Sequence, residues 1–325
     1  MINMLTNNRN QGIDILKFLA VLLILNSHME SVYGKYHVLA TGGALGDALF
    51  FFCSGFTLSL KPIGTFWGWY KKRINRIYST VFAVAIISCL FWGNKNDIIT
   101  IIVEGGGWFV QCIMLYYIII FIINKYFNEK INWILVLTSI ACFAWYFLMN
   151  GNVSGGVYGW GYFRWLIYFN FMLLGAKIGT NTKHVERKWW INLLLAGGGI
   201  MVFYTLYLLS IFNKYLGFLD VFSYIPLLIA VYYLYHMADN IVISDEMAYK
   251  GLYFLIRFVG GLCLEAYLIQ GYLITDAFNT LFPLNLIMVF SIIIFGAYFV
   301  RCLARFISQL FKESPFDVKK IFEFV

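Results

Sequence analysis

The stretch GIDILKFLAVLLILNSH, residues 12–28, is apolar over most of its length but carries three ionisable side chains. At about 100° per residue, the eleven steps from Lys17 to His28 complete three turns plus roughly 20°, so a helix places both on one face, with Asp14 within about 40°. His28 then lies roughly 16 Å deeper than Lys17, near the bilayer middle if Lys17 marks the interface. Ionisable groups at that depth are functional candidates by default. The alternative is a packing histidine, with Lys17 extending to the headgroups.

The composition is that of a membrane protein. The 325 residues are 61% hydrophobic and only 12% charged, outside the range of soluble domains. The net charge of +8 comes from short basic clusters between apolar runs, a pattern that the positive-inside rule explains. We therefore expect an all-α, polytopic integral membrane protein in contact with the lipid bilayer and without a nucleic-acid partner.

Ten apolar ranges are long enough to cross a bilayer core: 14–33, 39–60, 76–92, 107–124, 131–149, 163–179, 190–212, 218–237, 252–275 and 284–306. Thr41 to Ala44 weakens the start of the second range. With the N-terminus inside, all but four of the 24 lysines and arginines fall on or near the inner side, which predicts cytoplasmic termini. Residues 1–325 are expected to form a single transmembrane domain, with a short N-terminal segment (1–13) and a basic C-terminal tail (307–325).

No cleavable signal precedes the first apolar range, which should stay in the protein. The six cysteines all lie in apolar runs and lack metal-ligand spacing, so neither a disulfide nor a metal site is expected. Two outer stretches, EGGGWF (104–109) and GNVSGGVYGWGY (151–162), combine glycine with aromatic rings. Such rings populate the membrane interface for physical reasons, and they also stack on sugars.

Three motifs in order resemble the acyltransferase-3 family of bacterial membrane O-acyltransferases. They are Lys17 followed by His28 after ten residues, the run FFFCSGF (50–56), and the basic segment FWGWYKKRINRI (66–77). Trp108-Phe109 with Tyr116-Tyr117, and GGLCLEAYLIQ (260–270), extend the resemblance to nearly the full length. Many members carry Arg in place of Lys17, which keeps the charge without the bidentate fork. Many also carry His in place of Gln270, so this position is not the base here.

This resemblance implies an enzyme of the bacterial cytoplasmic membrane. It would transfer an acyl group, usually acetyl, from cytoplasmic acyl-CoA to a hydroxyl of a surface glycan or a lipid-linked saccharide. Other acyl groups such as succinyl, the identity of the acceptor, and a homo-oligomeric state stay open. The competing hypothesis is a polysaccharide translocase or proton-coupled transporter with His28 and Glu265 as a proton relay, although no related halves are visible in the sequence.

Catalysis would require a base for the acceptor hydroxyl and stabilisation of the oxyanion. His28 suits the role of general base or that of nucleophile, and the sequence does not choose between them. Lys17 is placed to bind the donor's phosphates or carbonyl, and Asp14 to hold Lys17. The alternative for this pair is an interface salt bridge without catalytic work.

Three basic residues are the candidates for binding coenzyme A. Arg73 and Arg76 share a helix face, with Lys72 four residues before Arg76, although the positive-inside rule also accounts for these charges. Ser54 is next to Gly55 and suits close helix packing, or a hydrogen bond to the oxyanion. Glu265 is a costly intramembrane charge. We expect it to orient His28, to pair with a basic residue such as Arg257 or Arg164, or to be protonated and merely packed.

Overall fold

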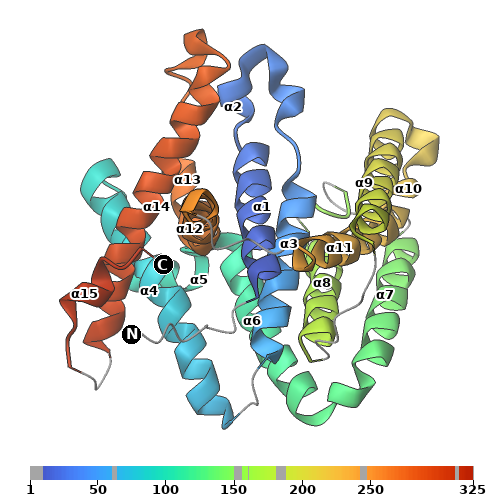
Figure 1. Cartoon of the computed structure of the whole chain (residues 1–325), viewed down its shortest axis with the longest axis horizontal. Helices are drawn as coiled ribbons and strands as arrows, with labels where there is room; N and C mark the ends of the chain where they lie inside the picture. The colour runs from blue at the N-terminus through green and yellow to red at the C-terminus, as the bar shows by residue number, and fades with distance from the viewer. Residues whose placement is uncertain are drawn as a thin grey trace.

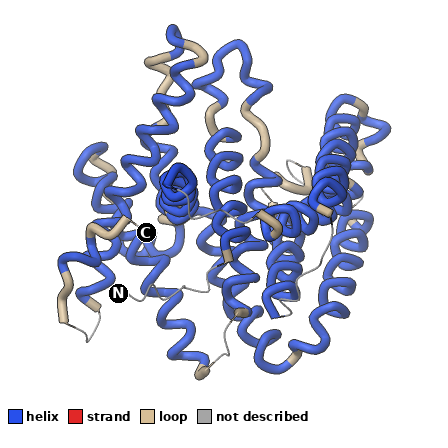
Figure 2. Tube along the Cα trace, viewed as in Figure 1, coloured by secondary structure: helices blue, strands red, loops and turns tan. Residues whose placement is uncertain are grey.

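The computed structural model describes residues 10–60, 64–149, 156–159, 161–180, 188–241, 247–311 and 315–324. Within these ranges the chain forms helices and turns and no strand (Figure 2), which confirms the all-α class. The helices are α1 Gln11–Ser27, α2 Glu30–Tyr33, α3 Gly43–Ser59, α4 Phe66–Trp92, α5 Ile98–Glu104, α6 Gly107–Tyr126, α7 Ile131–Leu148, α8 Phe163–Thr180, α9 Trp189–Phe212, α10 Leu219–Phe222, α11 Tyr224–Asp239, α12 Met247–Gly261, α13 Cys263–Leu273, α14 Leu284–Leu310 and α15 Val318–Ile321, with short 3-10 turns at η1 Gly34–Leu39, η2 Asn128–Lys130, η3 Lys214–Leu216 and η4 Asn279–Leu281.

Six of the described helices are long and apolar enough to cross a membrane, or up to eight if each of two bent helix pairs forms one span. The expected multi-span membrane protein is therefore confirmed, whereas the expected number of ten spans is not. Each expected range contains a helix, but α3 has only 17 residues, and the continuous helix α8 carries the polar residues Arg164, Asn170 and Lys177. Lys183, Arg187 and Lys312, on which the expected orientation partly rests, lie outside the described residues.

The first expected span is shorter than its apolar run. Helix α1 ends at Ser27, and the chain then bends by 67° into residues 30–39. Asn26 fixes this bend, because its side-chain amide donates to the carbonyls of Leu39 and Thr41, each at 2.9 Å. His28 is therefore the C-cap of α1 and exposed. The expectation that His28 lies within a continuous helix is wrong.

The ninth expected span, 252–275, is also broken. Helices α12 and α13 meet at Leu262 with a bend of 70°, and Figure 1 shows α12 nearly end-on beside the upright α14. At the break, the guanidinium of Arg301 on α14 donates to the Gly261 carbonyl. A side chain supplies the hydrogen bond that a continuous helix would otherwise make, as is common where backbone is unwound inside a membrane protein.

Helix α1 lies at the centre of the fold and contacts α3, α11, α12 and α13 (Figure 1). It belongs to both hydrophobic cores. Ile13, Leu16 and Ala20 pack in the core built with α3, α6, α8 and α11, whereas the later residues Val21 and Ile24 pack in the core built with α4, α13 and α14. The helix thus joins the two halves of the molecule.

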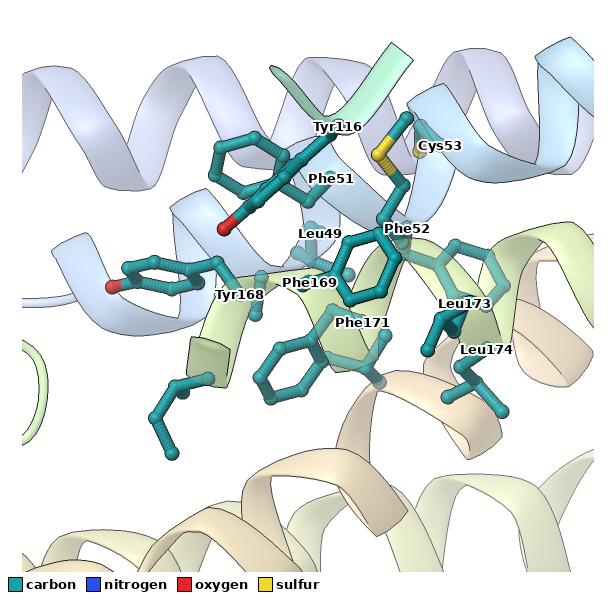
Figure 3. Packing of buried hydrophobic residues seen from close by; sticks show 14 of the residues in the cluster. Leu49, Phe51, Phe52, Cys53, Tyr116, Tyr168, Phe169, Phe171, Leu173 and Leu174 are labelled. Carbon is teal, nitrogen blue, oxygen red and sulfur yellow. The ribbon is translucent and has the colours of Figure 1, made fainter. Parts of the chain in front are cut away.

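Glycines bring α3 and α8 into backbone contact. A Cβ at Gly55 would overlap the Met172 carbonyl, and one at Gly175 would overlap the Phe52 carbonyl. Figure 3 shows the aromatic side chains that close around this contact, including Phe51 of α3 and Tyr168 of α8, whose rings stack at 5.5 Å. Small residues permit such an approach between helices in membranes.

We expect Gly55→Ala to destabilise the protein by about 1–3 kcal/mol, because the added methyl forces the two backbones apart. Gly197→Ala on α9 is the matched control, since a Cβ there meets nothing within 4 Å, and it should leave stability unchanged or slightly raised. Thermal unfolding of the two variants in the same detergent measures the difference. Equal transition temperatures would show that this contact does not limit stability.

Candidate active site

One cavity of about 760 Å³ collects most of the predicted site residues. Its size is within the range of small-molecule sites. Seven of the eight predicted residues line it: Asp14, Lys17, Ser54, Lys72, Arg73, Arg76 and Glu265. They come from α1, α3, α4 and α13, so four segments that are distant in sequence meet around one space. The eighth residue, His28, lies elsewhere.

The cavity wall is strongly basic. Seven cationic side chains line it, namely Lys17, Lys72, Arg73, Arg76, Arg257, Arg301 and Arg305, against the two carboxylates Asp14 and Glu265. Like charges so close together repel unless water or a ligand screens them. The cavity is therefore complementary to a ligand with several negative charges, for which arginine forks are well suited.

Arg73 shows how one of these cations is held in place. Its guanidinium lies over the Trp69 ring at 4.9 Å, one turn earlier on α4. Its Nε is buried and has no hydrogen-bond partner among the described residues. Arg76, three residues further on, is exposed and lines the same cavity. The expected common face of the two arginines is thus observed, and it faces the cavity.

Asp14 and Lys17 lie where α1 passes α12. A Cβ at Gly260 of α12 would lie 2.9 Å from the backbone nitrogen of Phe18, so the two helices touch there. The buried Asp14 carboxylate accepts a hydrogen bond of 3.1 Å from the Tyr253 hydroxyl. Helix α12 therefore fixes the acidic side chain beside the cavity.

Glu265 has a different partner from those expected. Its carboxylate lies 3.2 Å from Nε of Arg301, and both side chains are buried. The pair joins α13 to α14 directly after the break at Leu262, and Arg301 also binds the Gly261 carbonyl. The expected pairing with a basic residue is thus observed, but the partner is Arg301 rather than Arg257 or Arg164, and this ion pair replaces the expected contact with His28.

Three further basic residues of the cavity, Arg257, Arg301 and Arg305, were not predicted as site residues. Arg257 has a buried Nε without a hydrogen-bond partner in the described part of the chain. Arg305 donates to the carbonyl of Glu323, so the C-terminal tail folds back to hold it. The i, i+4 spacing of Arg301 and Arg305 on one apolar helix was the available signal, but their spacing is also compatible with the positive-inside rule.

The two roles considered for Ser54 and Gly55, helix packing and contact with a ligand, belong to different residues of the pair. Gly55 makes the close contact with α8, whereas Ser54 lines the cavity, as does Tyr117 of α6. Ser54 and Tyr117 therefore both form part of the cavity wall.

His28 lies in a separate, shallow depression with Glu30, Ser31, Gly34 and His37. Aromatic rings lie between His28 and the basic cavity. The His28 ring meets the edge of Tyr267 at 6.3 Å, Tyr267 lies 5.0 Å from Phe109, and Phe109 lies 4.9 Å from Phe50. Phe50 and Phe109 themselves line the basic cavity. We call Phe50, Phe109 and Tyr267 the aromatic layer.

The described residues contain no group of three or more His, Cys, Asp or Glu side chains arranged to hold a metal ion. Part of the aromatic and glycine-rich stretch expected on the outer side, residues 151–155 and Trp160, lies outside the described residues, as does His184.

We expect Arg301→Met to destabilise the protein by about 3–5 kcal/mol, because it leaves the Glu265 carboxylate buried without a partner. The double variant Glu265→Leu with Arg301→Met removes both charges and should be clearly more stable than the single variant. Unfolding by heat or denaturant in detergent gives both values.

The exposed pair Lys320 and Asp317, also 3.2 Å apart, provides a control, and Lys320→Met should produce no measurable change. The hydrogen bond from Lys320 lowers the pKa of Asp317 but lies in solvent. If Arg301→Met were as harmless as Lys320→Met, the buried pair would not hold α13 against α14.

Neither the curated proteins nor the solved structures gave a match. A family profile described as an acyltransferase domain matches residues 10–305, which include every predicted site residue and all but the end of the last long helix. The chain therefore belongs to the acyltransferase-3 family and is a membrane acyltransferase.

Proposed function

We propose that the protein is a bacterial O-acetyltransferase that transfers acetyl from cytoplasmic acetyl-CoA to a hydroxyl of a surface glycan or its lipid-linked precursor. The observation that carries this proposal is the cavity with seven cationic and two acidic side chains. Coenzyme A has a diphosphate and a 3′-phosphate, so its charge complements this wall. Arg73, Arg76 and Lys72 would bind these phosphates, assisted by Arg257 and Arg305.

The thioester is already activated, so the remaining tasks are proton removal, oxyanion stabilisation and alignment. As a general base, the His28 imidazole takes the proton of the acceptor hydroxyl while the oxygen of that hydroxyl attacks the carbonyl carbon of the thioester. The carbon–sulfur bond then breaks, and the coenzyme A thiolate takes up a proton. As a nucleophile, the His28 imidazole instead attacks the thioester and coenzyme A leaves as its thiolate; the acetyl-imidazole then passes the acetyl group to the acceptor hydroxyl, whose proton goes to the released imidazole. Lys17 and Ser54 line the donor cavity, on the other side of the aromatic layer from His28, so they would contact the donor there rather than the oxyanion that forms at His28.

The two substrates approach this reaction from opposite ends of α1. Lys17 lines the basic cavity, and His28 lies about 16 Å further along the helix. In the proposed complex the phosphates stay in the cavity, while the long pantetheine arm carries the thioester along α1 towards His28. The Phe50 and Phe109 side chains would rotate to let the thioester end of this arm through.

A proton-coupled transporter is less compatible with the observed contacts. The relay would have to join His28 to Glu265, yet the Glu265 carboxylate is bound to Arg301 on the cavity side. His28 lies beyond the aromatic layer. Glu265 and His28 thus lie on opposite sides of the aromatic layer and have different partners.

We expect Arg73→Ala or Arg76→Ala to weaken coenzyme A binding about ten- to a hundredfold, because each removes a charge-assisted hydrogen bond to phosphate. Lys71→Ala is the matched control. Lys71 belongs to the same basic run and is exposed, but it does not line the cavity. Titration of coenzyme A into the purified full chain in nanodiscs measures all three. A similar loss for Lys71→Ala would indicate a general charge effect and sink the phosphate-binding role.

We expect His28→Ala to lower the acetyl content of the host's surface glycan by about a hundredfold or more, as for loss of a general base or nucleophile. His37→Ala is the control, because His37 lines the same depression and should leave acetylation intact. Mass spectrometry of glycans from strains with matched membrane levels gives the result. A deletion strain that keeps its glycan esters would instead contradict the transferase itself.

A further inference from the structure

A second polar cluster lies on the His28 side of the aromatic layer. Asp47 is near the start of α3, and Arg164 is the second residue of α8. Asp47 lies one helical turn before Phe51, whose ring packs on Tyr168 and Trp108, and Arg164 lies over Trp108. Trp108 packs on Phe109, Phe109 on Tyr267, and Tyr267 meets His28, so one set of aromatic contacts joins the histidine to a carboxylate and a guanidinium that the mechanism above does not use.

Aromatic side chains hold both charged groups in place. The Arg164 guanidinium lies over the Trp108 ring at 3.8 Å, and Trp108 stacks in turn on Tyr168 at 5.8 Å. Asp47 lies on α3 one turn before Phe51, whose ring stacks on Tyr168 at 5.5 Å. Arg164 and Asp47 thus both lie near the stacked rings of Trp108 and Tyr168. These rings belong to the buried contact between α3 and α8.

Asp47 and Arg164 differ from a structural ion pair. The Glu265 and Arg301 side chains touch at 3.2 Å and are fully buried, whereas Asp47 and Arg164 are half-buried and form no direct ion pair in the described part of the structure. The Nε of Arg164 is buried without a hydrogen-bond partner there. Charges held apart in this way cost free energy unless a third group binds to both.

The chemistry of this cluster differs from that of the donor cavity. One carboxylate balances one guanidinium, and the nearby polar groups are the hydroxyls of Tyr168 and Tyr267. A phosphate would meet repulsion from Asp47. Neighbouring hydroxyls of an uncharged sugar, in contrast, can donate to the carboxylate and accept from the guanidinium.

We propose that Asp47 and Arg164 bind the hydroxyls of an uncharged sugar unit and hold the acceptor beside His28. This inference rests on the proposed function. Trp108 keeps the guanidinium flat rather than stacking on the sugar, since Arg164 covers one face of its ring and Tyr168 packs against it. Tyr267 separates this acceptor site from the donor cavity until the acyl group arrives.

The test compares Asp47→Asn and Arg164→Lys with Asp276→Asn in the full chain. Asp276 is exposed, lies in the connection after α13 on the same side, and its replacement removes the same charge. We expect Asp47→Asn and Arg164→Lys to lower glycan acetyl content at least tenfold at matched membrane levels. Coenzyme A affinity in nanodiscs should stay within about twofold of wild type. Asp276→Asn should keep wild-type acetylation.

Two results would overturn the acceptor site. One is unchanged acetylation in Asp47→Asn, and the other is loss of coenzyme A binding in parallel with acetylation, which would mean that the pair supports the donor cavity or the fold. Mass spectrometry of the wild-type glycan tests the ligand class, because an ester on a uronic acid or a phosphorylated unit contradicts an uncharged sugar. If the deletion strain retains its esters, the proposed function fails, and this is distinguishable from failure of the acceptor site alone.

Discussion

The constraint that shapes this molecule is an excess of positive charge inside an apolar protein. Seven basic side chains surround one cavity with only two carboxylates, and isolated charges are expensive in such surroundings. Several features offset this cost. Arg301 is bound to Glu265 and to a free backbone carbonyl, Arg73 lies on Trp69, and Arg305 is held by the tail. The break between α12 and α13 also lowers this cost, because it leaves the Gly261 carbonyl available to accept a hydrogen bond from Arg301.

The aromatic layer divides the protein into two electrostatic environments. On one side of Phe109 lies the basic cavity, and on the other lie His28 and the balanced charges of Asp47 and Arg164. Water and ions do not readily cross tightly packed rings, so the proposed transfer between substrates from the two faces of a membrane would gain from such a barrier. Because these rings also pack on both hydrophobic cores through Phe50 and Tyr267, their motion is coupled to the contact between the two halves.

The sequence predicted those parts of the site that depend on one helix at a time. Helical pitch alone placed Asp14 with Lys17, and Arg73 with Arg76, and in the structure these residues line one cavity. The sequence did not predict the partner of Glu265, because this partner depends on how α13 packs on α14 after a break at Gly261. Nor did it predict the end of α1, which is set by the hydrogen bonds of Asn26 across the bend. Asp47 was missed although it lies in an apolar range, where the reasoning applied to Glu265 applies equally.

The position of His28 at a helix end has a consequence for the proposed chemistry. Within a continuous helix, an imidazole at the same depth would be enclosed by neighbouring helices and reached only through the donor cavity. At the C-cap of α1 its ring is exposed on one side and meets Tyr267 on the other. In the proposed complex, an acceptor too large to enter the protein reaches His28 from the open side, while only the thioester end of the pantetheine arm has to cross the aromatic layer. Under that proposal, the bend that shortens α1 separates access for a bulky glycan from access for coenzyme A.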